Sequence, residues 1–405
     1  MGLRPERNKY DLIVITLLAS MAFGGIGGAL QVSRLLTIIF LPLFIKKFQI
    51  CKRGTMSYIY FSYLLIAYSS LSLLWTSDFS EGVKELIYFC IHFLFFFEIL
   101  FFSKLAVNPK ESITKGWMFA VILTLIVAIW EISTDNHLSY IAHNTEGDSN
   151  IDGVVFKHKF AAVTFFNYNS YVTFLCLALP FIYYRIMDKT KISFRVILPI
   201  IVILLSCFCI LCNASRGGLL TIIVMLLIYI LRQPKSFTKV IILCVIAGIV
   251  AFVFIQYGEL FFTAITTRSS SGLLEDSSRA KIWGAVFRTF KSTLGLGTGI
   301  GGGSSSMSEF TSGIIVPHNL YLEVLLEFGI LIFIPFITYI MRLYYTTLTT
   351  KNRELRNILY ISLLPLPIYS IIDSRYILNY WVFAYFASIT FFIKSTEINS
   401  NHKLK

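Results

Sequence analysis

Apolar runs recur along nearly the whole chain, separated by short polar segments. Nearly every run is long enough for a membrane-crossing α-helix, because roughly 20 residues span the ~30 Å hydrocarbon core of a bilayer; the second run, 34–45, is short. We expect twelve such spans, near residues 11–28, 34–45, 57–76, 83–103, 116–133, 168–184, 196–213, 217–231, 240–257, 319–341, 357–372 and 376–393. The pattern therefore predicts an all-α polytopic membrane protein.

Two longer polar intervals, 134–165 and 257–318, interrupt this series. The second divides the chain into a bundle of nine spans (1–256), a large external loop (257–318) and three C-terminal spans (319–405). Within the loop, a 3.6-residue period over 279–291 predicts a short amphipathic helix. The residues on its expected apolar face are Ile282, Trp283, Val286, Phe287 and Phe290.

Composition supports the membrane class, since 56% of the residues are hydrophobic and only 14% are charged, against ~25% in soluble domains. The net charge of +13 would suggest a nucleic-acid partner in a soluble protein. Here the basic residues gather in alternate segments between spans, among them 4–9, 46–53, 185–195 and 342–356. Under the positive-inside rule these segments are cytoplasmic, which places both termini in the cytoplasm and both long loops outside. The charge thus indicates topology, and we expect no nucleic-acid partner.

The first span begins with basic residues, as a signal peptide does, but no small-residue cleavage site follows it. We therefore expect a retained membrane anchor. The seven cysteines lie in predicted spans or on the cytoplasmic side, without the spacing of a metal site. A disulfide framework and a metal centre are not expected.

Two arginines occupy unusual positions on the predicted external side. Arg216 stands in the tight junction between the seventh and eighth spans, and Arg279 falls on the apolar face of the loop helix near its N-terminus. A guanidinium group binds two oxygens at once and keeps its charge, and a helix N-terminus also favours anions. The pair is therefore a candidate diphosphate site. The alternative for Arg216 is a side chain that reaches lipid headgroups.

His318 and Asn319 open the tenth span, and Glu323 and Glu327 follow near one face of the same helix. A histidine titrates near neutral pH and can accept a proton from a hydroxyl group. His318 is thus a candidate general base, although a lone histidine is more often structural. Candidate substrate-binding residues beside Arg216 and Arg279 are Asn319, Glu323, Glu327, Asn169 and Arg288.

Three further features have competing interpretations. The glycine-rich segment Gly295–Gly303 lacks the Lys-Ser/Thr and the preceding strand of a nucleotide loop, so we interpret it as a mobile hinge or lid. Asp373 and Arg375 share a very short external turn, which predicts a local ion pair; the alternative is that they support the residues of the site. His92 and Glu98 in the fourth span either face the bundle interior or belong to a functional site.

This set of residues suits one reaction class: a sugar hydroxyl displaces a lipid diphosphate. The two arginines would stabilise the charge that develops on the leaving diphosphate. His318 would take the hydroxyl proton, and no metal or cofactor would be required.

The same residues resemble, in their order, the O-antigen ligase and polymerase superfamily, bacterial membrane enzymes that act on undecaprenyl-diphosphate-linked glycans. The motifs cover about 215–330, and Asn169 resembles the asparagine that opens a middle span in such proteins. The motifs are Ser215-Arg216-Gly217-Gly218, Arg279 four residues before Trp283, the glycines at 295, 297 and 299, His318-Asn319-Leu320-Tyr321-Leu322 and Glu327-Phe328-Gly329.

The resemblance implies a GT-C-like fold and an inverting, metal-independent glycosyltransferase in the bacterial cytoplasmic (inner) membrane. It implies an active site on the periplasmic face, where Arg216 and Arg279 bind the donor diphosphate and His318 activates the acceptor. The implied partners are an undecaprenyl-diphosphate-linked oligosaccharide donor, a glycan or lipid A–core acceptor and membrane lipids. A chain-length regulator or other assembly proteins would join them.

The activity stays open at this point. We favour a polymerase that joins repeat units of O-antigen, capsule or exopolysaccharide, and the alternative is a ligase that transfers the glycan to lipid A–core. Outside this enzyme class, a transporter or flippase would place its ionisable residues near the membrane centre. A structural subunit of an assembly complex would use the loop only to dock partners.

Overall fold

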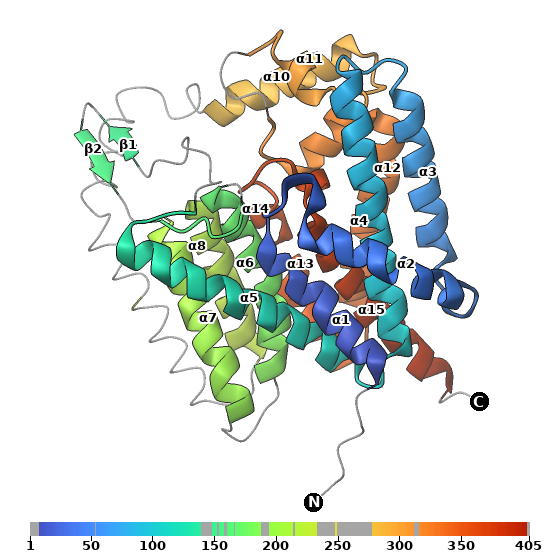
Figure 1. Cartoon of the computed structure of the whole chain (residues 1–405), viewed down its shortest axis with the longest axis vertical. Coiled ribbons are helices and arrows are strands. Elements are labelled where there is room, and N and C mark those ends of the chain that lie inside the picture. The colour runs from blue at the N-terminus through green and yellow to red at the C-terminus, as the bar shows by residue number, and fades with distance from the viewer. Residues whose placement is uncertain are drawn as a thin grey trace, which may run out of the picture.

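Long α-helices make up most of the described chain in the computed structural model (Figure 1). The structure describes residues 8–52, 54–138, 148–151, 154–157, 160–165, 167–187, 194–213, 215–232, 248, 278–311 and 316–402. The elements of the first part are α1 (Lys9–Ala19), η1 (Ser20–Phe23), η2 (Gly28–Leu30), α2 (Val32–Cys51), α3 (Met56–Ser72), α4 (Phe79–Leu105), α5 (Pro109–Thr134), β1 (Asp148–Ile151), β2 (Val154–Lys157), α6 (Tyr168–Ile186), α7 (Phe194–Cys212) and α8 (Arg216–Arg232). Those of the second part are α10 (Ser278–Ser292), α11 (Gly303–Met307), α12 (Leu320–Thr349), α13 (Arg353–Leu363), α14 (Leu366–Tyr369), η4 (Tyr376–Leu378) and α15 (Tyr380–His402).

Most predicted spans coincide with observed helices to within a few residues. The main differences in length are at α2, predicted over 34–45 and observed over 32–51, and at the first span, which leaves α-helical geometry after Ala19. Helix α5 also begins seven residues earlier than predicted, and α12 and α15 end eight and nine residues later. The span expected near 240–257 lies outside the described residues. Apolar periodicity located these helices because each has the length and composition that lipid or a protein core requires.

One predicted span is wrong as a continuous helix. Residues 357–372 divide into α13 and the single turn α14, with Pro365 at the break and Pro367 in the turn α14 itself. Proline has no N–H to donate and its ring clashes with the preceding turn, so the helix ends there. The following residues, 370–379, run as a short irregular segment with the single turn η4 before α15 begins. We call residues 370–379 the central turn.

The all-α prediction is also incomplete, because β1 and β2 form a small antiparallel hairpin within the 134–165 interval. Ile151 pairs with Val154 and Asp148 with Lys157. The two residues between the strands in the sequence are Asp152 and Gly153, a dipeptide typical of two-residue hairpin turns.

Helix α12 bends at Gly329, whose φ of 62° and ψ of −167° are not helical. This backbone geometry is accessible to glycine and costly for other residues. The first part of α12 therefore runs at its own angle, and it carries Glu323 and Glu327 toward α4.

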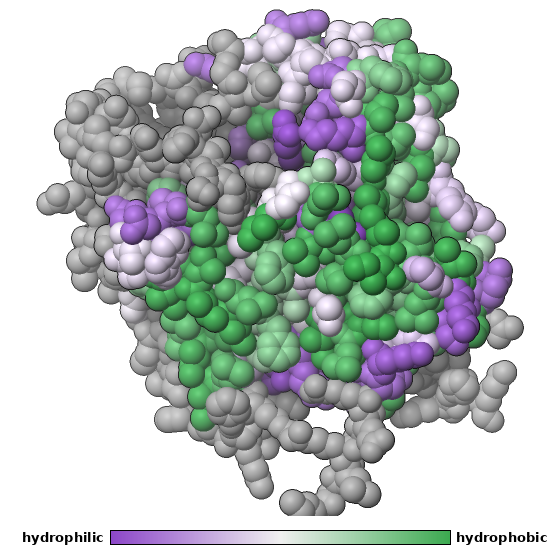
Figure 2. Space-filling view, viewed as in Figure 1, coloured by the Kyte–Doolittle hydropathy of each residue, from purple (hydrophilic) through white to green (hydrophobic). Residues whose placement is uncertain are grey.

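Three of the described helices are long and apolar enough to cross a membrane: Phe79–Leu105, Pro109–Thr134 and Leu320–Thr349. Helix α4, with 27 residues, is ~40 Å long, more than the hydrocarbon core requires. Figure 2 shows hydrophobic residues across the middle of the visible face, with hydrophilic residues toward the top below α10 and along the bottom edge. The start of α1 and the end of α15 lie at the end of the bundle opposite α10 and α11 (Figure 1). We call the end that carries α10 and α11 the α10 end.

Candidate functional site

The central turn lies where the N-terminal ends of three helices meet. The Leu320 amide at the start of α12 donates to the Ser370 carbonyl oxygen (2.9 Å), and Ser170 Oγ in the first turn of α6 donates to Asp373 Oδ1 (2.9 Å). At the start of α8, a Cβ added to Gly217 would lie 2.8 Å from Ile372 Cγ1. Three segments far apart in the sequence are thus brought to one place, and each carries a predicted site residue.

Asp373 is the buried polar centre of this turn, with 1% of its surface exposed. Its carboxylate accepts hydrogen bonds from Ser170 Oγ and from Asn379 Nδ2 (3.3 Å), and its amide donates to Tyr376 Oη (2.8 Å). Burial raises the pKa of Asp373 to about 7. The predicted ion pair with Arg375 is wrong, because Asp373 faces α6 while Arg375 lines a cavity beside α4 and α12.

We expect the buried charge of Asp373 to make stability depend on pH. An ordinary aspartate loses its proton near pH 4, whereas Asp373 keeps it to about pH 7 in the folded state. The folded protein thus binds more protons than the unfolded chain in this window, so stability falls as pH rises from about 4 to 7. The variant Asp373→Asn removes this contribution to the pH dependence of stability.

Thermal unfolding of both proteins in detergent at a series of pH values measures the effect. The midpoint of Asp373→Asn relative to wild type should increase from pH 4 to pH 7. Parallel curves for the two proteins would contradict the buried-carboxyl assignment.

Arg216 is the first residue of α8 and is exposed. The segment before it is fixed, since Ser215 Oγ accepts from the Gly218 amide (3.2 Å) and the Asn213 side chain forms two hydrogen bonds with the Ala161 backbone (2.7 and 2.9 Å). A cation at a helix N-terminus faces the positive end of the helix dipole, which is unfavourable unless an anion lies there too. The position of Arg216 is consistent with its predicted role in binding an anionic group.

His318 and Asn319 lie at the start of α12, as predicted. Asn319 Oδ1 accepts from the amides of Tyr321 (2.9 Å) and Leu322 (3.2 Å), so this side chain caps the helix. His318 has a φ of 48°, in the left-handed region that few residues other than glycine adopt. Such strain is retained where the surroundings fix the backbone, and it is frequent at functional sites.

Helix α10 is attached to this segment, because Trp283 Nε1 donates to the Pro317 carbonyl oxygen (3.1 Å). Its apolar face packs as predicted for Ile282 and Val286, which contact Met307 and Leu326. The assignment of Phe287 to this face is wrong, since that side chain is 49% exposed. The buried face centres on Ile282, and Phe287 lies ~140° away from it around the helix.

Two further predicted residues have defined positions. Arg288 donates from Nη2 to the Phe310 carbonyl oxygen (3.3 Å) on the exposed side of α10. Asn169 lies in the first turn of α6, but the residue that caps this helix is Asn167, whose Oδ1 accepts from the Ser170 amide (2.8 Å). The backbone of Arg279 lies in the first turn of α10, and the prediction for its side chain lies outside the described part of the structure.

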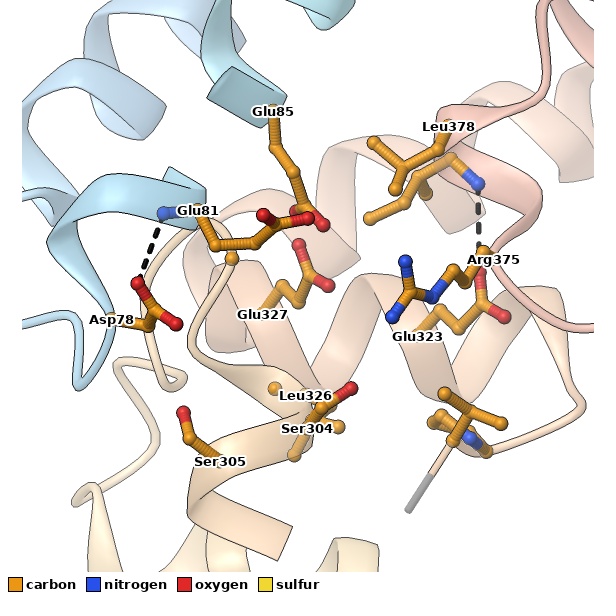
Figure 3. Close-up of a pocket in the computed structure, with 15 residues that line it drawn as sticks. Asp78, Glu81, Glu85, Ser304, Ser305, Glu323, Leu326, Glu327, Arg375 and Leu378 are labelled. Atoms are coloured by element: carbon orange, nitrogen blue, oxygen red, sulfur yellow. Dashed lines mark hydrogen bonds between the residues drawn. The ribbon is translucent and has the colours of Figure 1, made fainter. Parts of the chain in front are cut away.

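The predicted common face of Glu323 and Glu327 is confirmed, and both line a cavity of about 330 Å³ at the α10 end (Figure 3). Glu85 of α4 and Arg375 of the central turn line it from other directions, and Glu323 Oε2 accepts from the Ile377 amide (3.5 Å). We call this space the acidic cavity. The residues that line it are Asp78, Glu81, Glu85, Gly301, Gly303, Ser304, Ser305, Val316, Pro317, Glu323, Leu326, Glu327, Arg375, Ile377 and Leu378.

The interpretation of Gly295–Gly303 as a mobile lid is wrong. The amides of Thr298 and Gly299 donate to the carbonyl oxygens of Leu326 (2.8 Å) and Glu327 (3.1 Å) near the bend of α12. From the other side, Trp75 Nε1 donates to the Gly297 carbonyl oxygen (3.1 Å). The segment thus joins α12 to the connection between α3 and α4, and its glycines allow the backbones to approach closely.

This packing predicts that Gly297→Ala strongly destabilises the protein. A Cβ at Gly297, where φ is 82°, would lie 2.5 Å from the Gly329 amide nitrogen. We expect a loss of ~2–4 kcal/mol, from backbone strain together with overpacking. The thermal midpoint of the solubilised protein measures this loss.

Gly54→Ala is the matched control, because Gly54 also has a positive φ (72°), but beyond its chain neighbours no described atom lies within 4 Å of an added Cβ. It should cost only the backbone term of ~1–2 kcal/mol. Equal effects of the two substitutions would show that the glycine segment does not pack closely against α12.

His92 and Glu98 both lie inside the bundle with none of their surface exposed. Arg34 Nε approaches His92 Nε2 (3.5 Å), and the Arg34 guanidinium stacks on the Tyr88 ring (3.5 Å to its centroid). Of the two interpretations given for His92 and Glu98, the structure agrees with side chains that face the bundle interior.

The described helices, with a polar site at one end of them, define a polytopic helical membrane protein. Residues 199–337 match the protein-family model described as O-antigen ligase, so this part of the chain is similar to that family. The matched range contains Arg216, Arg279 and His318, whereas Glu85 and Arg375 lie outside it.

The chain is also similar to the teichuronic acid biosynthesis protein TuaE of Bacillus subtilis (strain 168), with 24% identity over 312 residues. This similarity covers 74% of the chain and 62% of the relative, so the match spans less than two thirds of that protein. Together the two matches confirm the predicted resemblance to the O-antigen ligase and polymerase superfamily.

Sequence reasoning missed two residues of the site. Glu85 lies two residues after the start of the predicted fourth span, and Arg375 was assigned to a local ion pair. A carboxylate at the end of an apolar run was the available signal for Glu85, because charged residues at such depth are usually functional or paired. No local pattern indicates that Arg375 faces α12.

Proposed function

We propose that the protein is a membrane glycosyltransferase that transfers an undecaprenyl-diphosphate-linked glycan to a sugar hydroxyl. The observation that carries this proposal is the meeting of the α6, α8 and α12 N-termini at the central turn. It brings the segments of Asn169, Arg216 and His318 together at one end of the bundle. The match to the O-antigen ligase family over 199–337 supports the reaction class.

In the proposed reaction the acceptor hydroxyl attacks the anomeric carbon of the donor sugar. The new glycosidic bond forms as the bond to the diphosphate oxygen breaks on the opposite face, which inverts the configuration. His318 takes the hydroxyl proton, and the arginines Arg216 and Arg279 stabilise the charge on the departing undecaprenyl diphosphate. This step requires neither a metal ion nor a cofactor.

We favour polymerisation of repeat units over transfer to lipid A–core. The relative from Bacillus subtilis is named for teichuronic acid biosynthesis, which supports a role in building a glycan polymer. The same arrangement of residues also fits a ligase, because both reactions displace the same leaving group. The difference lies in the acceptor.

We further propose a GT-C-like bundle of twelve spans in the bacterial cytoplasmic membrane, with both termini cytoplasmic. The α10 end then faces the periplasm or cell exterior, where the lipid-linked donor is presented. The three proposed parts are the bundle 1–256, the loop 257–318 and the C-terminal helices 319–405. A chain-length regulator or another assembly protein would act beside the loop.

The experiment compares a strain that lacks the gene with the same strain carrying wild type or His318→Ala at matched membrane levels. Carrier-linked and core-linked glycans are extracted separately and resolved by length. A polymerase predicts that single repeat units accumulate without the active protein and that long chains return only with wild type. Long chains held on the carrier lipid would instead identify a ligase, and full synthesis with His318→Ala would overturn the proposed site.

A further inference from the structure

The acidic cavity contains buried oxygen atoms that have no hydrogen-bond partner in the described part of the structure. Glu85 and Glu323 are only 5% and 4% exposed, yet Glu85 Oε2 and Glu323 Oε1 have no hydrogen-bond partner among the described residues. Glu327 Oε2 is also buried and also has no hydrogen-bond partner among the described residues. Leaving a buried acceptor unpaired is costly, so such atoms are usually satisfied by a ligand or by water.

The size and lining of the cavity suit a small polar molecule. Its volume of about 330 Å³ lies at the lower end of the ~300–1,000 Å³ typical of ligand sites. Figure 3 shows Glu85, Glu327 and Arg375 converging on the same space from α4, α12 and the central turn. Among the described residues, no three His, Cys, Asp or Glu side chains are grouped as a metal site would require.

The charge of the cavity excludes the donor diphosphate as its ligand. Five carboxyl groups line it, and among the described lining residues Arg375 is the one cation. The ionised carboxylates among them disfavour any further negative charge. A ligand that offers several hydroxyl groups, or an ammonium group, would instead satisfy the unpaired oxygens.

The cavity also lies beside the proposed general base. Val316 and Pro317 line it, and His318 is the next residue in the chain. A molecule in the cavity is therefore adjacent to the start of α12, where the acceptor hydroxyl must be activated.

We propose that the acidic cavity binds a sugar ring of the acceptor glycan and selects neutral or amine-bearing sugars over sugars that carry a carboxylate. This inference rests on the proposed glycosyl transfer. Glu85, Glu323 and Glu327 accept hydrogen bonds from the sugar hydroxyls, and Arg375 donates to a ring or substituent oxygen. Glu85 contributes to the specificity through its charge.

Binding of simple glycosides tests the inference without any transfer reaction. The full chain in phosphatidylcholine nanodiscs is titrated with methyl glucosaminide, methyl glucoside and methyl glucuronide, and binding is followed by saturation-transfer NMR. We expect the glucosaminide to bind at least about tenfold more tightly than the glucuronide, since one ion–ion contact near a protein surface supplies that difference.

Variants that change the charge of the cavity should shift the ratio of glucosaminide to glucuronide affinity in opposite directions. Glu85→Gln keeps the side-chain shape and should narrow this ratio to about threefold or less, whereas Arg375→Gln should widen it. Glu309→Gln is the matched control, because Glu309 is an exposed glutamate that does not line the cavity. Thermal unfolding confirms that each variant is folded.

A wild-type protein that binds the glucuronide as tightly as the glucosaminide would overturn the inference, and so would an unchanged ratio in Glu85→Gln. A protein that transfers glycans without this preference overturns only the cavity assignment. A protein with the preference that transfers no glycan overturns the proposed reaction.

Discussion

His318→Ala should reduce glycan transfer by ~10²–10⁴-fold while the protein remains folded. This is the usual contribution of a positioned general base, and the variant retains the charged groups that bind the donor. His318 begins α12 next to the Asn319 cap, so its removal should leave the helix itself intact. The measurement is single-turnover transfer by purified protein, with thermal unfolding as the test of folding.

The pH dependence separates a base from a structural histidine. For wild type, the rate should rise with pH as His318 loses its proton and becomes able to accept another. His318→Ala should lose this rise along with most of the rate. An alanine variant with the wild-type pH profile would show that another group accepts the proton.

Arg216→Ala should have the second largest effect, a loss of ~10²–10³-fold in transfer. Such a loss is typical when one preorganised group that stabilises developing charge is removed. Arg216→Lys should recover only part of the rate, because an ammonium group keeps the charge but cannot bind two oxygens in a fixed fork. Rates measured at saturating acceptor over a range of donor concentrations give the loss in Arg216→Ala and the recovery in Arg216→Lys.

Arg232→Ala is the matched control on the same helix. Arg232 ends α8, ~24 Å from Arg216, and stacks on the Tyr360 ring (3.9 Å to its centroid). It should change stability by ~0.5–1 kcal/mol and leave the rate per folded molecule unchanged. Similar losses of rate at both arginines would indicate a general effect of charge and not a site at Arg216.

The positions of the helices could be predicted from the sequence because each helix has its own local signal. Apolar runs of sufficient length located α4, α5 and α12, and a 3.6-residue period located α10 within one residue of its observed bounds. The break at Pro365 was also present in the sequence. It was overlooked because the apolar run continues through it.

The arrangement of the site depends on contacts between distant segments, which no local pattern records. Glu323 and Glu327 were placed on one face because they share a helix, whereas Glu85 joins them only through the packing of α4 beside α12. The glycine segment shows the same limit. Its composition fits both a mobile lid and a tightly packed connection, and only the hydrogen bonds to Leu326 and Glu327 distinguish them.

The central claim is glycosyl transfer from a lipid diphosphate, and reconstitution tests it most directly. The purified full chain is placed in liposomes with an undecaprenyl-diphosphate-linked repeat unit as the sole substrate, and mass spectrometry follows the products. Our proposal predicts one new glycosidic bond for each undecaprenyl diphosphate released, with both products lost in His318→Ala. Substrate that crosses the bilayer unchanged, with no new bond formed, would contradict the proposal and identify a transporter.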